Sequence, residues 1–152
     1  MKPIRNILVA TDFSGASRPA FRRAVELAKA NSAALWITHV AVPSVPSSPN
    51  GYVLPRVYDE MDAAIRADAT KHLRHLLATA QKAGVRGRTL LLRGAPHEAL
   101  GKSAREHRAD LIVLGTHGRT GLARFLIGSV ASRVVATAPC PVLTVRARGG
   151  TS

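Results

Sequence analysis

The clearest apolar run in the chain is Asp110-Leu111-Ile112-Val113-Leu114, and it ends in Gly115-Thr116-His117-Gly118. Consecutive aliphatic residues with β-branched members are typical of a strand that is buried on both faces of a parallel sheet. Glycines directly after such a strand let backbone N–H groups turn toward a ligand, because no Cβ blocks a close approach. This stretch therefore predicts a buried strand with a ligand-binding loop at its carboxyl end.

Outward from this stretch, short apolar runs alternate with helical patterns along the whole chain. The pattern predicts strands at 7–10, 34–40, 88–92, 110–114 and 142–145, and helices at 17–31, 57–83, 94–107 and from 128 to the Pro139 break. Strands that alternate with helices predict a parallel sheet covered on both faces, with right-handed crossovers. Ligands of such sheets bind at the carboxyl ends of the strands, where the strand order reverses.

Several side chains have expected positions in these helices. Ser17 is expected to be the N-cap of the first helix. The apolar stripe of the long helix is expected to comprise Met61, Ile65, Leu73, Leu76 and Ala80. The inward side chains of the last helix are expected to be Val130, Val134 and Val135. Residues 1–147 are expected to form one domain and 148–152 a flexible tail, and the Pro- and Ser-rich stretch 43–51 an irregular loop.

Composition limits the classes of protein that fit. The 152 residues include 22 Lys and Arg against 9 Asp and Glu, a formal net charge of +13. This charge favours an anionic partner such as a nucleotide, a nucleic acid, an acidic protein or a membrane surface. The sequence has no apolar run of the length of a membrane span and no signal-peptide core, and its one cysteine excludes an internal disulfide. A cytoplasmic protein is therefore expected.

The strand-end glycines belong to a longer pattern that predicts a phosphate site. Gly115-x-x-Gly118 is followed after nine residues by Gly128-Ser129, which opens a predicted helix. Backbone N–H groups in a glycine loop and at a helix N-terminus both attract anions, and the Ser129 hydroxyl can add a hydrogen bond. The pattern is neither GxxxxGK[ST] nor GxGxxG. It describes a phosphate site that needs no lysine.

This spacing resembles the nucleotide motif of the universal stress protein family, and the resemblance covers nearly the whole chain. Other matching segments are 6–14 at the first strand and acidic turn, His39-Val40, 110–118 and 139–145. The resemblance implies a single-domain, three-layer α/β sandwich, Rossmann-like and similar to adenine nucleotide alpha hydrolases. Its parallel sheet would have five strands in the order 3-2-1-4-5, with the ligand between strands 1 and 4.

The resemblance also implies the ligand and the residues that hold it. The ligand would be ATP, which Mg²⁺ could accompany. Asp12 would face the ribose or a phosphate-bound cation, and the Val40 backbone would meet adenine. The phosphates would lie on Gly115, Gly118, Gly128 and Ser129, with Thr11, Thr116, His117, Arg119 and Val130 as further cofactor-binding residues.

The residues themselves leave alternatives open. Asp12 could cap the turn after its strand, and the glycines could merely form a tight loop. His117 could pack rather than meet a phosphate, and Arg119 and Arg124 could either neutralise phosphate charge or be solvated. His72 and His75 are a possible metal pair at i, i+3, with a solvated helix face as the alternative. Cys140 is expected to be a buried, inert thiol.

Three functions follow. The first is a nucleotide-binding stress-response or signalling protein that at most hydrolyses ATP slowly, since no general base is evident beside the motif. The second is a non-specific nucleic-acid-binding module driven by the charge, although the basic residues are spread along the sequence. The third is an adenylating enzyme, for which the chain has little room. The resemblance further implies a homodimer through the edge of strand 142–145, and no membrane partner is expected.

Overall fold

The computed structural model describes residues 2–42, 50–51, 54–117 and 127–147. Five strands alternate with four α-helices along the chain, and one short 3₁₀ helix follows the first strand. The elements are β1 (Asn6–Ala10), η1 (Gly15–Ser17), α1 (Arg18–Asn31), β2 (Ala34–Ala41), α2 (Pro55–Lys82), β3 (Gly87–Arg93), α3 (Pro96–Glu106), β4 (Leu111–Gly115), α4 (Ser129–Thr137) and β5 (Val142–Val145). The predicted alternation is confirmed, with boundaries shifted by one or two residues.

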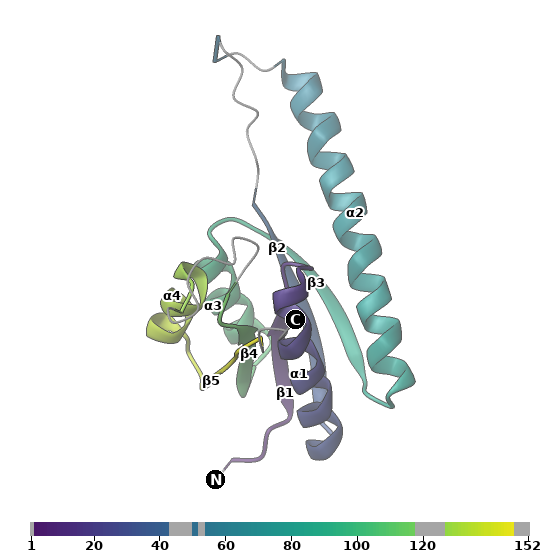
Figure 1. Ribbon diagram of the computed structural model, residues 1–152, viewed down its shortest axis with the longest axis vertical. Coiled ribbons are helices and arrows are strands. Elements are labelled where there is room, and N and C mark those ends of the chain that lie inside the picture. Colours follow the sequence, from purple (N-terminus) through teal and green to yellow (C-terminus); the bar gives the residue numbers. More distant parts are fainter. Residues whose placement is uncertain (1, 43–49, 52–53, 118–126, 148–152) are drawn as a thin grey trace, which may run out of the picture.

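All five strands pair in parallel, in the order β3-β2-β1-β4-β5 (Figure 1). This is the expected sheet order. Strand β1 lies at the centre, where Leu8 is in register with Trp36 of β2 and Ile112 of β4. The order reverses between β1 and β4, because the chain first builds outward from β1 to β3 and then returns to the other side of β1.

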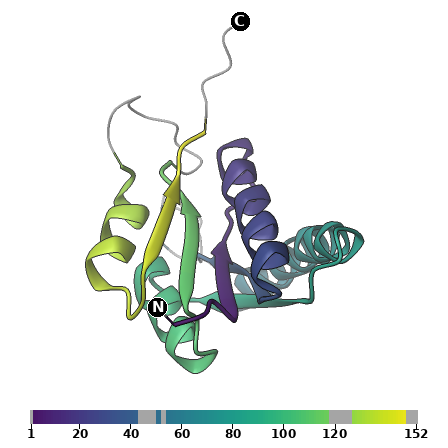
Figure 2. The ribbon, with the colours of Figure 1, turned by 90° about the horizontal axis from the view of Figure 1, so that it is seen from below.

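Each face of the sheet has its own apolar core, which completes a three-layer sandwich (Figure 2). Ile7 and Val9 of β1 pack in the core under α1 and α2. Leu8 packs in the second core, with Leu100 of α3 and Val134 of α4. The three consecutive β1 residues are fully buried because neighbouring side chains point to opposite faces, and both faces are covered.

Helix α2 is longer than the sheet that it covers. Its 28 residues span about 42 Å, and its first turns project past the ends of the strands (Figure 1). Ala69, Leu73 and Ala80 are buried. Leu73 and Ala80 belong to the predicted apolar stripe, so the prediction is confirmed for these two residues. Met61 is 39% exposed, so its predicted place in the core is wrong. The periodicity is present, but at this level of α2 the core has already ended.

Two expectations for the other helices are also wrong. Val130 and Val135 of α4 are exposed, and only Val134 of the predicted trio is buried. Ser17 makes no capping hydrogen bond to α1. Its hydroxyl instead donates to the Ser14 carbonyl, at 2.9 Å, since Ser17 already has helical backbone angles. Residues 43–49 of the loop predicted at 43–51 lie outside the described residues, as does the tail predicted at 148–152.

Candidate functional site

A cleft of about 670 Å³ lies where β1, β2 and β4 end and α4 begins. This is the edge of the sheet at which the strand order reverses, the usual ligand site in open parallel sheets. The predicted site residues that line it are Thr11, Asp12, Val40, Gly115, Thr116, His117, Gly128, Ser129 and Val130. The predicted residues Gly118 and Arg119, and with them Arg124, lie outside the described residues.

The turn after β1 presents Asp12 to the cleft and is fixed by its own polar groups. One carboxylate oxygen of Asp12 accepts hydrogen bonds from the Ser14 N–H, at 3.0 Å, and from the Ser14 hydroxyl, at 2.5 Å. The Thr11 hydroxyl accepts the Phe13 N–H and pairs with the Ser17 hydroxyl. Asp12 therefore caps the turn after β1, which was the alternative to a ligand-binding role in the sequence analysis. Because it also lines the cleft, the cap holds its carboxylate in a fixed place there.

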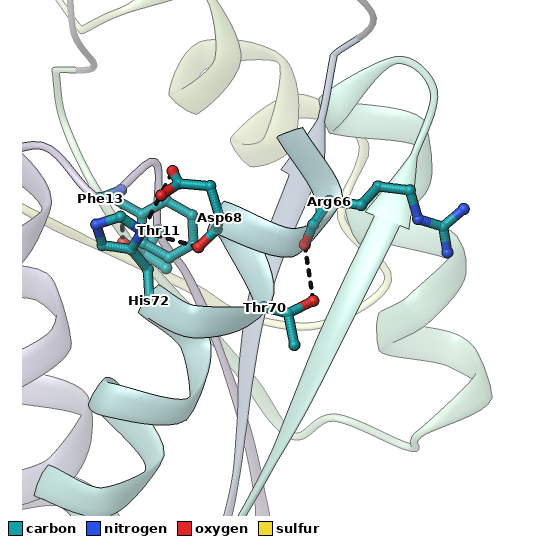
Figure 3. A network of polar contacts seen from close by, with 6 residues as sticks. All are labelled: Thr11, Phe13, Arg66, Asp68, Thr70 and His72. Carbon is teal, nitrogen blue, oxygen red and sulfur yellow. Dashed lines mark hydrogen bonds and ion pairs between the residues drawn. The ribbon is translucent and has the colours of Figure 1, made fainter. Parts of the chain in front are cut away.

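Phe13 has an uncommon backbone conformation, with φ at +65°. A bulky residue in the left-handed region is strained, and such strain persists only where surrounding contacts enforce it. The Phe13 ring stacks on His39 of β2, at 4.3 Å between centroids, and on His72 of α2, at 4.9 Å (Figure 3). His39 in turn donates from Nδ1 to the Thr11 carbonyl, at 2.8 Å. The stack thus ties the Asp12 turn to two neighbouring elements.

The sequence gives partial signals for this stack. The position of His39 at the sheet edge could be predicted, because it lies near the end of a predicted strand. The positive φ of Phe13 could not be predicted from its residue type. His72 has a 50% exposed side chain whose Nδ1 donates to the Asp68 carbonyl. Among the described residues no group of three or more His, Cys, Asp or Glu side chains could hold a metal ion. His72 is half exposed and is held by Phe13 and Asp68.

Gly115 and Gly128 are needed because the backbone around them is tightly packed. A Cβ on Gly115 would lie 3.2 Å from the Ala16 carbonyl oxygen, and one on Gly128 would lie 3.1 Å from that of Thr116. Most real Cβ contacts are longer. The Gly128 N–H donates to the same Thr116 carbonyl at 2.7 Å. Gly128 thereby fixes the start of α4 against the end of β4, and its own N–H is used in doing so.

The first turn of α4 supplies the donors that an anion would meet. Ser129, Val130 and Ala131 line the cleft, and the leading N–H groups of a helix have no partner within it. The positive end of the helix dipole points the same way. The described lining has no lysine or arginine, so this backbone is its main source of positive potential.

Part of the cleft lining is apolar. Its walls include Val40 at the end of β2, Leu100 of α3, Leu114 of β4 and Ile65 of α2. A planar heterocycle can be held between such aliphatic side chains, while backbone groups at the strand ends give it orientation. The cleft thus combines backbone donors that suit an anion with aliphatic surface that suits a ring.

Cys140 lies away from this cleft. It packs beside the core under α3 and α4 and is partly buried. Desolvation raises the pKa of the Cys140 thiol, and the Asp110 carboxylate adds to the rise. The thiolate, which is the reactive form, is therefore scarce at neutral pH. This supports the expected inert thiol, although its burial is less complete than expected.

A parallel sheet with a cleft of this kind defines a class, the open α/β proteins with a ligand cleft at the point where the strand order reverses. The chain also matches the model of the Universal stress protein family over residues 3–146. Together with the relatives below, this shows that the chain belongs to the universal stress protein family.

Relatives and solved structures agree. Universal stress protein YxiE of Bacillus subtilis is 36% identical over 144 residues, covering 92% of this chain and 97% of the relative. The structure of UspA from Lactobacillus plantarum superposes with a TM-score of 0.83 at 32% identity, covering 96% of this chain and all of that one. A universal stress protein solved in complex with cAMP superposes with a TM-score of 0.67 at 31% identity, covering 95% and 98%. Among the described residues, the helices lack the combination of length and hydropathy that a membrane span needs.

Proposed function

We propose that the cleft binds an adenine nucleotide, with ATP as its ligand, and that the chain acts in stress response or signalling through its nucleotide-bound state. The convergence of three strand ends on the first turn of α4 carries this proposal. A family member at 31% identity was solved with cAMP, which carries the same base. We assign the phosphates to the loop after β4 and the start of α4, and adenine to the backbone near Val40.

Asp12 is assigned to the ribose. Hydroxyl groups can donate to a carboxylate, whereas phosphate oxygens would repel it. Asp12 is the only carboxylate in the described lining, so a Mg²⁺ ion that arrives with ATP would be held largely by phosphates and water. The same carboxylate already accepts two hydrogen bonds from Ser14, which makes it a poor general base. We therefore expect slow ATP hydrolysis at most.

Calorimetry with ATP, ADP, AMP and cAMP tests the proposal, with GTP as the control for the base. Adenine nucleotides should bind and GTP should bind more weakly. Mass spectrometry of ligand released from the purified protein gives an independent answer, because a physiological ligand of a fixed cleft often copurifies. If no adenine nucleotide binds at millimolar concentration, the proposal fails.

We further infer a homodimer through the outer edge of β5, the last strand of the sheet. The carbonyls of Pro141 and Val145 accept from β4, so by alternation the Thr144 N–H faces outward. Thr144→Pro removes that donor and should convert a dimer to a monomer of about 16.1 kDa in light scattering. Thr144→Val keeps the N–H and should stay dimeric. A Thr144→Pro protein that remains dimeric places the interface elsewhere.

The ligand and the free thiol both fit the nucleotide-rich, reducing cytoplasm, and we expect the protein to act there.

A further inference from the structure

A second concave region lies on the far side of α2 from the Phe13 stack. It is a groove of about 460 Å³ between α2 and the outermost strand β3. Arg66, Lys71 and Arg74 of α2 line it, and Leu91 of β3 lies among the lining residues with Ala67 and Thr70. We call these three cations and the groove that they line the basic groove. Its apolar lining can receive the aliphatic stems of the cations while their charged ends reach solvent.

No carboxylate neutralises the basic groove in the part of the chain that the structure describes. Arg66, Lys71 and Arg74 take part in none of the ion pairs there. The acidic residues nearest in sequence are engaged elsewhere, since Asp62 pairs with Arg93 and Asp68 pairs with His72. Figure 3 shows that the Arg66 side chain leaves α2 on the side opposite to Asp68 and His72. The groove therefore keeps a concentrated positive charge.

The charge is extended rather than confined to one point. Arg66 and Arg74 are two helical turns apart, about 12 Å along α2. Arg93 of β3 is paired with Asp62, and the Arg88 guanidinium lies over the Trp36 ring, so the row is formed by the three α2 cations. A single small anion would engage a part of this row, whereas a polymer with regularly repeated charges can engage all of it.

We propose that the basic groove binds the phosphate backbone of double-stranded nucleic acid, without reading its sequence. The residues that line the groove include no aromatic ring, so the stacking platform that single strands need is missing there. Three unpaired cations on a convex helix beside a sheet edge are instead suited to backbone phosphates, which supply affinity but no sequence information. This activity is separate from the nucleotide cleft, since the two sites share no lining residue.

The salt dependence of binding measures the number of cations involved. For B-DNA the slope of log K against log salt is about −0.9 for each phosphate neutralised, so three cations contribute about −2.7. Between about 50 and about 200 mM salt this part of the affinity falls about 40-fold. The experiment uses fluorescence anisotropy of a labelled DNA duplex with the full chain, at several salt concentrations.

The variant Arg66→Gln/Lys71→Gln/Arg74→Gln should weaken binding strongly at low salt and make the slope less negative by about 2.7. All three side chains are exposed, so the fold should tolerate the change. The matched control is Arg22→Gln/Lys29→Gln/Arg105→Gln, which removes the same net charge from exposed sites on α1 and α3. In this control variant, the changes in affinity and in slope should each be at most about a third of those in the groove variant.

Two results would overturn the proposal. One is a wild-type chain that binds no duplex at low salt. The other is an equal loss in the two triple variants, since this would mean that net charge alone acts. ATP calorimetry on the groove variant keeps the two proposals apart, because nucleotide binding there should equal that of the wild type.

Discussion

Replacing Gly128 by alanine tests whether close packing at the start of α4 sets the geometry of the cleft. The new Cβ would lie 3.1 Å from the Thr116 carbonyl oxygen. That oxygen cannot retreat freely, because it accepts the Gly128 N–H at 2.7 Å and the Thr116 N–H is bound to the Val145 carbonyl at 3.1 Å. Strain of this kind in a packed region typically costs about 1–3 kcal/mol. For a domain of this size the expected fall in Tm is about 2–12 °C.

Nucleotide affinity should fall as well, because the strain is relieved by moving the first turn of α4 away from the phosphates. Loss of one hydrogen bond to a charged group, about 1.5–3 kcal/mol, corresponds to at least about a tenfold weaker Kd. Thermal unfolding followed by ATP calorimetry measures both effects. Gly15→Ala is the matched control, since nothing lies within 4 Å of its Cβ, and it should change neither quantity. A Gly128→Ala protein with unchanged Tm and ATP affinity would refute the packing argument.

Three further outcomes are expected. Gly101→Ala in α3 should raise the free energy of unfolding by about 0.5–1 kcal/mol in urea titrations. The new Cβ would have its nearest neighbouring atom 3.9 Å away, and glycine disfavours the helix. Destabilisation would show that the site is tighter than this distance indicates. Asp110→Ala should cost about 1–3 kcal/mol at neutral pH, since Asp110 accepts the Arg5 and Asn6 N–H groups. Those hydrogen bonds lower the pKa of Asp110 below 3.8, so the wild-type advantage is complete above that pH and disappears as the pH falls through the lowered pKa; a gap that persists under acid would contradict this. Cys140 should react with a disulfide reagent more slowly in the native protein than in guanidinium at neutral pH, and equal rates would show that burial does not protect it.

The fold follows from the sequence because its decisive signals are local. Continuous aliphatic runs such as 111–114 indicate burial on both faces, and their alternation with helical patterns indicates a parallel sheet between two helical layers. The positions of Met61, Val130 and Val135 do not follow in the same way. Each lies on an apolar stripe, but whether a stripe meets the core depends on where the sheet ends.

The glycine pattern identified Gly115, Gly128 and Ser129, which line one cleft, and at Gly115 and Gly128 the backbone is crowded. Asp12 and Val40, which line the same cleft, were expected from the family resemblance. The internal use of the Gly128 N–H could not be predicted, because it depends on how near β4 lies to α4. The basic groove could not be predicted from the sequence either. Its cations are spread among other charged residues in the sequence, and only the placement of β3 beside α2 gathers them.

The overhang of α2 has a thermodynamic consequence. Residues 69–80 are held by the core, whereas nearly all side chains of 55–64 are exposed. These turns therefore rest on intrinsic helix propensity, on local pairs such as Arg56–Glu60 and on the one ion pair of Asp62 with Arg93 of β3. Isolated helical turns of this length are marginal in water. The amides of 55–64 should therefore exchange with solvent by local fraying, and those of 69–80 only by global opening. Helix α2 is continuous in the structure, but its two parts should open with different free energies.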